Sequence, residues 1–313
     1  MKKKFKALIV GGGKIVFGNS NLDPDSHYGA FIQSKKVDVK GIVDIKKSVI
    51  LKIRNKYKVK AFDSLDLALK STRPDIISIC TPDKFHFNAC HSIINSQYFP
   101  RIIFLEKPCF QNSVELNKIS KEAKKKNIEI IINHTRRFDD NFKMLKSNIK
   151  KNTFGTIQRV YFTYYNGWLH NATHQTDILN YLFDDLLIKV KSKKSFYSKN
   201  NLDVILKFKK NLSLVFATGY PENPYQIFDI DLHFKNFRLL IDNFGKNAYL
   251  QKRELNLLGE SFLSSKKNIF KKQKIYPMKN AVKIIIKFLE TNNKSLIKDY
   301  NISTIGRSMQ SIW

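Results

Sequence analysis

Cysteine is scarce in this chain of 313 residues, and long apolar runs are missing. The three cysteines, Cys80, Cys90 and Cys109, are odd in number and lack metal-binding spacing, which predicts free thiols in a reducing compartment. No stretch approaches the roughly 18 apolar residues that span a membrane, so we expect no membrane partner. The basic start is followed by the short apolar run Ala7–Val10, which is too brief for a signal peptide. These absences predict a cytoplasmic protein.

Arginine is the second shortage, with 9 arginines against 47 lysines in a chain of net charge +30. Arginine is the usual reader of base edges, and the lysines are scattered instead of forming a block, so we expect no nucleic-acid partner. A polyanion site is the alternative interpretation of so basic a chain. A solvated basic surface explains the scatter better, and it favours anionic small molecules such as dinucleotides and nucleotide sugars.

The first half of the chain alternates strands with helices. Apolar runs, capping residues and turns predict strands at 4–10, 37–44, 61–62, 75–80, 102–106 and 129–133. This alternation predicts an α/β fold with a doubly wound parallel sheet. Ligands of such sheets bind beyond the carboxyl ends of the strands, which is where a glycine turn, Asp44, Thr81, Glu106 and Asn133 fall.

The second half predicts an α+β domain with a large, mostly antiparallel sheet. We expect strands at 157–165, 187–195, 202–208, 212–218, 226–234, 237–242 and 248–252, and helices at 174–183, 278–290 and 303–312. The polar stretch Gly259–Gln273 is typical of a surface loop. The chain is too long for one small core, so we expect a dinucleotide-binding domain at 1–134 and a substrate domain at 135–313.

A glycine turn follows the first strand. Gly11 and Gly13 take the first two positions of the G-x-G-x-x-G pattern, and Val16 takes the third. Glycine lets a pyrophosphate approach the backbone at a helix N-terminus. The expected acidic residue is Asp44, and the inserted loop Gly18–Ser26 explains its distance of 31 residues from Gly13. An ordinary strand–turn–helix is the alternative, but the regular alternation behind the turn favours dinucleotide binding.

Lys107 stands between Glu106 and Pro108, directly after the apolar run Ile102–Leu105. A plain surface lysine is the alternative, since most lysines of this chain must be that. The position of Lys107 at the mouth of the same sheet as the glycine turn favours a functional role. An ammonium there can bind a substrate hydroxyl and stabilise developing alkoxide charge.

Two histidines and an aspartate gather in one short stretch of the second half. His174 and Asp177 are three residues apart and share a helical face, and His170 lies one turn earlier. A purely structural turn is the alternative to acid–base work. No third ligand stands at a suitable spacing, so we expect no metal. Tyr164 is more typical of a core or lining residue than of a catalyst.

These motifs together resemble the Gfo/Idh/MocA oxidoreductases over the whole chain. The resemblance rests on the glycine turn, Asp44, Cys80-Thr81-Pro82 with His86, Glu106-Lys107-Pro108, His134–Phe138 and His174–Asp177. It implies an N-terminal Rossmann domain that binds a nicotinamide dinucleotide and a second domain that binds a sugar or cyclitol against its sheet. We also expect a homodimer or homotetramer formed through the C-terminal sheet.

The resemblance also assigns residues. It implies that the cofactor is bound by Gly11, Gly13, Lys14, Ile15, Asp44, Thr81, Pro82, His86, Glu106 and Lys107, although His86 alone is typical of a surface or capping residue. It implies that the substrate is bound by Arg136, Tyr164, His170, Asn171 and His174. Lys107 and His174 match the family's catalytic lysine and histidine, and we add His170 to them. His170 departs from the pattern, because the family has an aspartate there.

Three functions are compatible with these residues. The first is an NAD(P)-dependent oxidoreductase that transfers hydride to or from a sugar or nucleotide sugar, in keeping with relatives from surface-polysaccharide pathways. The second is a cyclitol or dihydrodiol dehydrogenase. The third is a non-catalytic regulator that senses dinucleotides, which the substitution at His170 keeps open. Asp44 favours NAD, whereas Lys46 and Lys47 leave NADP possible.

Overall fold

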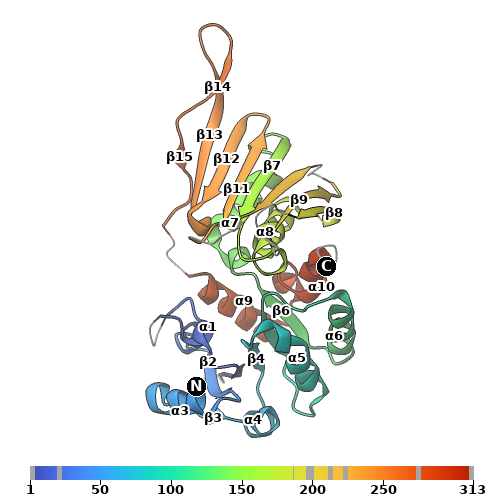
Figure 1. Cartoon of the computed structure of the whole chain (residues 1–313). Helices are drawn as coiled ribbons and strands as arrows, with labels where there is room; N and C mark the ends of the chain where they lie inside the picture. Colours follow the sequence, from blue (N-terminus) through green and yellow to red (C-terminus); the bar gives the residue numbers. More distant parts are fainter. Residues whose placement is uncertain are drawn as a thin grey trace. The chain divides into compact units, whose positions relative to one another are not determined.

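The computed structural model describes residues 4–19, 23–185, 187–194, 201–210, 214–220, 225–272 and 276–309 (Figure 1). The chain divides into two compact units. The first comprises Met1–Asp139 and Lys274–Gly306, and the second comprises Asp140–Gln273 and Arg307–Trp313. Each unit contains one of the two β-sheets.

The first unit is built on a six-stranded parallel sheet. Its strands are β1 (Phe5–Val10), β2 (Val37–Val43), β3 (Ala61–Phe62), β4 (Ile76–Ile79), β5 (Ile102–Glu106) and β6 (Glu129–Asn133). In the order β3-β2-β1-β4-β5-β6 the chain reverses direction beside β1, which is the ligand-binding switch point of a doubly wound sheet. The expected α/β fold of this half is confirmed.

Three of the α-helices of this unit begin directly after a residue whose side chain caps the helix. The helices are α1 (Lys14–Phe17), α2 (His27–Ile32), α3 (Lys47–Lys52), α4 (Leu65–Thr72), α5 (His86–Asn95) and α6 (Ser113–Lys125), with shorter segments at Ile53–Tyr57, Asp83–Phe85 and Thr135–Phe138. Ser26, Ser64 and Asn112 accept backbone N–H groups at the starts of α2, α4 and α6. The inserted loop before α2 therefore ends in a helix that returns the chain to the sheet.

Helix α9 (Pro277–Thr291) packs with the first unit although it lies late in the chain. Its apolar side joins a core that also contains α2 and strand residues such as Ala7 and Phe104. The segment Lys294–Ile297 and the helix α10 (Ile302–Met309) follow it. The contacts thus group residues 274–306 with the first unit, whereas the sequence boundary put all of 135–313 in the second domain. The apolar stripe of α9 explains the difference, because it needs a core to cover it.

The second unit is built on a mixed sheet of nine strands within the described residues. They are β7 (Ile157–Tyr164), β8 (Leu187–Lys194), β9 (Leu202–Phe208), β10 (Val215–Gly219), β11 (Asp229–Phe234), β12 (Phe237–Asp242), β13 (Asn247–Leu255), β14 (Ser261–Leu263) and β15 (Lys267–Asn268). The order is β14-β13-β12-β11-β7-β10-β9-β8, with β15 beside β13. Among the pairs formed there, β7–β10 is parallel and the others are antiparallel, which confirms the expected α+β half.

Burial alternates along the strands of this sheet, so its two faces differ. Helices α7 (Asp140–Lys150) and α8 (Thr173–Phe183) belong to the same unit, and the ring of Phe183 on α8 lies 6.3 Å from that of Phe234 on the core face. On the other face, the Tyr161 ring stacks on Phe216 at 5.3 Å and stays 39% exposed.

Two elements of the second unit differ from the sequence expectation. Helix α7 was not anticipated, although Phe142 and Leu145 are spaced three apart and both are buried. The expected loop Gly259–Gln273 contains the short strands β14 and β15. Their side chains are exposed, so the sequence shows no burial pattern, and pairing with β13 alone makes them strands.

Candidate functional site

The glycine turn after β1 needs its glycines for two different reasons. Gly11 has φ of 97°, and a Cβ atom there would lie 2.8 Å from the carbonyl carbon and oxygen of Cys80. Neither the backbone angle nor the neighbouring strand end can accommodate a side chain. Gly13 has an extended conformation, and a Cβ atom there would meet nothing within 4 Å. The space above Gly13 is therefore open to a ligand.

Asp44 at the end of β2 is part of the same turn. One of its carboxylate oxygens accepts the Gly12 N–H at 2.8 Å, and the other accepts the Lys46 N–H at 2.9 Å. These bonds hold the carboxylate beside the glycines, as the interpretation of the inserted loop predicts. Asp44 stays partly exposed, so its remaining lone pairs can accept further hydrogen bonds.

The residues after the turn separate into exposed and buried positions. Lys14 and Ile15 begin α1 and are exposed, with 47% of Ile15 accessible. Val16, at the third glycine position, is fully buried in the core of the unit. Lys14 and Ile15 can therefore face a ligand, whereas Val16 serves the packing of the helix on the sheet.

The end of β4 supplies a polar atom that lacks a partner. The Thr81 hydroxyl is buried and has no hydrogen bond, and Pro82 beside it is exposed. His86 is fully buried, with Nδ1 2.9 Å from the Pro108 carbonyl oxygen and Nε2 2.9 Å from that of Thr81. The expectation of a surface or capping histidine is wrong, because the ring bridges the loops after β4 and β5.

Lys107 follows β5 and is partly buried. Burial lowers the pKa of its ammonium, the charges of Glu106 and Asp83 oppose this change, and the charge of Arg136 adds to it. A lysine whose pKa lies below its ordinary value can exchange a proton closer to neutral pH. Arg136, an expected substrate residue, lies in the segment Thr135–Phe138 of the same unit. The peptide bond between Lys107 and Pro108 is cis.

Glu106, the residue before Lys107, belongs to a buried polar cluster. Its Oε1 lies 2.7 Å from Nε2 of His27 and 2.5 Å from Nδ2 of Asn133, which donates to it. Nδ1 of His27 lies 2.6 Å from the Ser78 hydroxyl. Glu106 was expected to face the cofactor, but its carboxylate turns to these buried groups. Sequence reasoning missed His27 and Ser78, although the one serine of the run Ile76–Ile79 is a signal of a polar partner.

The histidines of the second unit lie at the start of α8. His170 is exposed in the segment Trp168–Ala172, and His174 is partly buried in the first turn of α8. Asn171 is partly exposed beside them, and Asp177 is buried, with 3% of it accessible. The backbone is helical from one histidine to the other, so the spacing of four residues puts both on one side. His170, Asn171 and His174 can therefore face a common ligand.

Tyr164 is not a substrate residue. It is fully buried, and its hydroxyl donates to the Leu202 carbonyl at 2.7 Å and accepts the Leu202 N–H at 2.6 Å. Burial raises its pKa to about 12. The alternation along β7 points this side chain to the core face, so the expectation that Tyr164 binds substrate is wrong.

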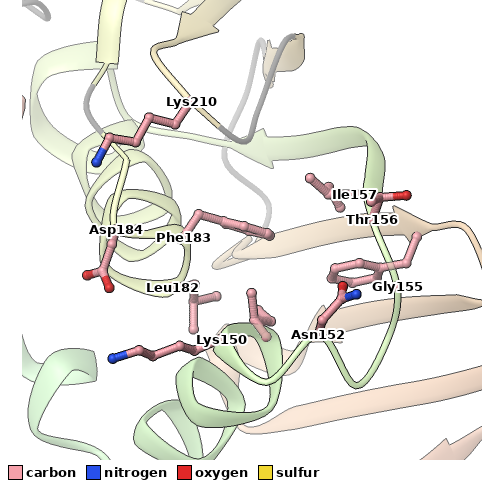
Figure 2. Close-up of a pocket in the computed structure, with 11 residues that line it drawn as sticks. Lys150, Asn152, Gly155, Thr156, Ile157, Leu182, Phe183, Asp184 and Lys210 are labelled. Carbon is pink, nitrogen blue, oxygen red and sulfur yellow. The ribbon is translucent and has the colours of Figure 1, made fainter.

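A separate cleft lies at the opposite end of α8. It has a volume of about 550 Å³, and its lining includes Lys150, Asp184, Lys210 and Phe183 (Figure 2). Helix α8 has eleven residues, so this cleft lies roughly 15 Å from the histidines at its start. Among the described residues, no group of three or more His, Cys, Asp or Glu side chains could hold a metal. The described helices include none long and apolar enough to cross a membrane.

The first unit fits a dinucleotide. Gly13 leaves open space where a pyrophosphate would approach the backbone, Asp44 offers acceptors for ribose hydroxyls, and the Thr81 hydroxyl lacks a partner. These three features surround the carboxyl ends of β1, β2 and β4, which meet at the switch point of the sheet. The fold and this edge define a dinucleotide-binding protein of the Rossmann class.

Comparison with known proteins identifies the family of the first domain. Residues 5–134 match the model of the Gfo/Idh/MocA "Oxidoreductase family, NAD-binding Rossmann fold". Residues 5–134 therefore form an NAD-binding Rossmann domain of the Gfo/Idh/MocA type, and the resemblance noted in the sequence is confirmed for this part of the chain. A curated relative, myo-inositol 2-dehydrogenase of Thermotoga maritima, is 25% identical over 115 residues, which are 36% of this chain. The match spans 34% of the relative, about a third of its length.

Solved structures extend the similarity to the whole chain. A dehydrogenase from Chromobacterium violaceum has a TM-score of 0.78 at 14% identity, and the match covers 100% of this chain and 94% of the other. The WlbA dehydrogenase of Bordetella pertussis, in complex with NADH and UDP-GlcNAcA, has a TM-score of 0.77 at 13% identity, with 99% and 95% covered. At such identities these likenesses establish the fold of both halves.

Two glycine substitutions should separate folding from ligand binding. Gly13→Ala puts a methyl group into open space, so we expect an unchanged melting temperature but NADH binding weakened by on the order of tenfold or more. Gly11→Ala forces a Cβ atom against the Cys80 backbone, so we expect a loss of stability of about 1–3 kcal/mol. Thermal denaturation and fluorescence titration with NADH measure the two effects. Equal NADH affinity of Gly13→Ala and the parent protein would remove Gly13 from the binding site.

Proposed function

We propose that this protein is an NAD(P)-dependent oxidoreductase that transfers hydride between nicotinamide and a secondary alcohol or ketone of a sugar or nucleotide sugar. The observation that carries the proposal is Lys107, whose pKa is lowered by burial at the edge of the sheet that also bears the glycine turn. The family of the first domain supports the redox chemistry. The WlbA structure, which has NADH and UDP-GlcNAcA bound, supports the choice of substrate class.

In this proposal the residues of the chain divide the work. The nicotinamide, when bound, supplies the hydride acceptor or donor. Lys107 binds the reacting oxygen of the substrate and stabilises the negative charge that develops on it. His174 gives or takes the proton of that oxygen. Arg136 and His170 bind the more distant polar groups of the substrate, and Asn171 adds a neutral donor and acceptor.

Cofactor choice is the first test of the proposal. We expect NADH to bind more tightly than NADPH by on the order of tenfold, about 1.4 kcal/mol, because the Asp44 carboxylate would repel a 2′-phosphate. Fluorescence titration of both cofactors measures the ratio. Asp44→Asn keeps a hydrogen-bond acceptor but removes the negative charge, so it should reduce the ratio of NADH affinity to NADPH affinity. Asp38→Asn is the matched control, because Asp38 lies on β2, the strand that Asp44 follows, and pairs with Lys40. Tighter NADPH binding by the parent protein would reverse the assignment.

Replacement of the lysine tests the chemistry. Lys107→Met keeps most of the side-chain length but removes the charge, so we expect turnover to fall by on the order of 10²–10⁴ while NADH affinity changes far less. Steady-state kinetics on the identified sugar substrate measure the loss. Lys121→Met, an exposed position on α6, should leave the rate unchanged. Normal turnover of Lys107→Met would exclude the proposed mechanism.

The two histidines should have different kinetic effects. The family has an aspartate at the position of His170, and an imidazole cannot supply that fixed negative charge to His174. We therefore expect His170→Asn to raise KM more than it lowers kcat, as a loss of substrate binding, and His174→Asn mainly to lower kcat. An equal collapse of kcat in both variants would instead support a proton relay through the pair. If the parent protein turns over no sugar, nucleotide sugar or cyclitol with either cofactor, the dinucleotide-sensing regulator becomes the better interpretation.

A further inference from the structure

His27 has an unusual position for a histidine that begins a helix. It begins α2, directly after Ser26 at the end of the inserted segment, yet its side chain is completely buried. Both ring nitrogens are engaged, Nδ1 with the Ser78 hydroxyl at 2.6 Å and Nε2 with the Glu106 carboxylate at 2.7 Å. The ring also lies 5.1 Å from that of Phe104. The inserted loop thus delivers one imidazole to the residue that precedes Lys107.

The surroundings of His27 favour a charged pair. Burial opposes the imidazolium, but Cys80 and the Glu106 carboxylate outweigh burial and raise the pKa of His27 to about 10. Burial likewise opposes the charge of Glu106, but the bonds from His27 and Asn133 and the charge of Lys107 lower its pKa. Both shifts favour an imidazolium beside a carboxylate. The groups that face it come from β4, β5 and β6, so the pair is enclosed by three neighbouring strands.

The charge of Glu106 matters because Lys107 is the next residue. The charged groups that act on Lys107 are Glu106, Asp83 and Arg136, and Glu106 is the strongest of them. A carboxylate whose negative charge is not compensated makes a neighbouring ammonium hold its proton more tightly, which raises the pKa of the ammonium. When a cation compensates the carboxylate, burial has the larger effect on Lys107, and the lysine proton is easier to release.

We propose that His27 is a positioning residue for Lys107. His27 anchors the Glu106 carboxylate in the core and neutralises its charge. The role that it serves in catalysis rests on the proposed function of Lys107. The inserted segment then does more than lengthen the glycine turn, because it leads into the helix whose first residue, His27, compensates Glu106.

The test measures the pKa of Lys107 without any substrate. Acetic anhydride reacts with unprotonated amines, so the pH dependence of Lys107 acetylation, read by peptide mass spectrometry, reports its titration. His27→Gln retains a hydrogen-bond donor near the position of Nε2 but removes the positive charge. We expect the Lys107 pKa to rise by about one unit, a roughly tenfold smaller unprotonated fraction at a given pH. The double variant His27→Gln with Glu106→Gln leaves no charge to neutralise, so it should cancel the rise.

The matched control is His91→Gln. His91 also pairs with a glutamate, Glu122 at 2.9 Å, but this pair is partly exposed on α5 and α6. His91→Gln should leave the titration of Lys107 unchanged. An unchanged Lys107 pKa in folded His27→Gln, or the same shift in His91→Gln, would overturn the proposal. If His27→Gln does not fold, Glu106→Gln is compared with the double variant. The pKa of Lys107 must then be the same in these two variants, because neither has a Glu106 charge for His27 to neutralise. A different Lys107 pKa in the two variants would refute the proposal.

Kinetics distinguish this inference from the proposed function. If the enzyme is active, His27→Gln should raise the apparent pKa of Lys107 in the pH dependence of kcat/KM by about one unit. A merely structural defect would lower the rate at every pH without changing that apparent pKa. If the protein proves inactive but acetylation shows the shift and its cancellation, the proposed function fails while the pairing of His27 with Glu106 stands. If catalysis depends on Lys107 but the profile does not move, the inference fails and the function stands.

Discussion

The carboxylate of Glu106 is the buried charge around which the first unit is organised. A carboxylate in a protein interior is unfavourable unless a partner compensates it. His27 of α2 and Asn133 of β6 hydrogen-bond to it, and Ser78 of β4 holds His27 from its other nitrogen. One charge thus connects a helix to three adjacent strands, at the strand end from which Lys107 projects. The cluster therefore joins the ends of these strands at the edge of the sheet that also bears the glycine turn.

The glycine turn satisfies a different constraint at the same edge. Gly11 lies so close to the Cys80 backbone that no side chain fits, which brings the ends of β1 and β4 together. The Asp44 carboxylate accepts the next amide, that of Gly12, and so joins β2 to the turn. Steric exclusion at Gly11 and hydrogen bonding at Asp44 leave Gly13 open. The second unit contributes its candidate groups differently, from the first turn of a buried helix that carries His174.

Much of the architecture could be predicted because it depends on local patterns. Apolar runs located the six parallel strands of the first unit. The prediction was weaker where a pattern was ambiguous. Tyr164 follows the sheet alternation into the core, and its hydroxyl bonds the Leu202 backbone, which no neighbouring residue could indicate. Helix α7 was missed because its apolar positions are few among lysines and asparagines.

By itself the sequence determined the alternation of strands and helices, the glycine turn and the position of Lys107 at a strand end. These depend on the chemistry of residues within a few positions of one another. Only the tertiary structure decided that His27 pairs with Glu106, 79 residues later, and that α9 returns to the first core. The pairing of a buried histidine depends on which groups the strand order brings together, and no local spacing encodes that. The burial that sets the pKa of Lys107 arises in the same way.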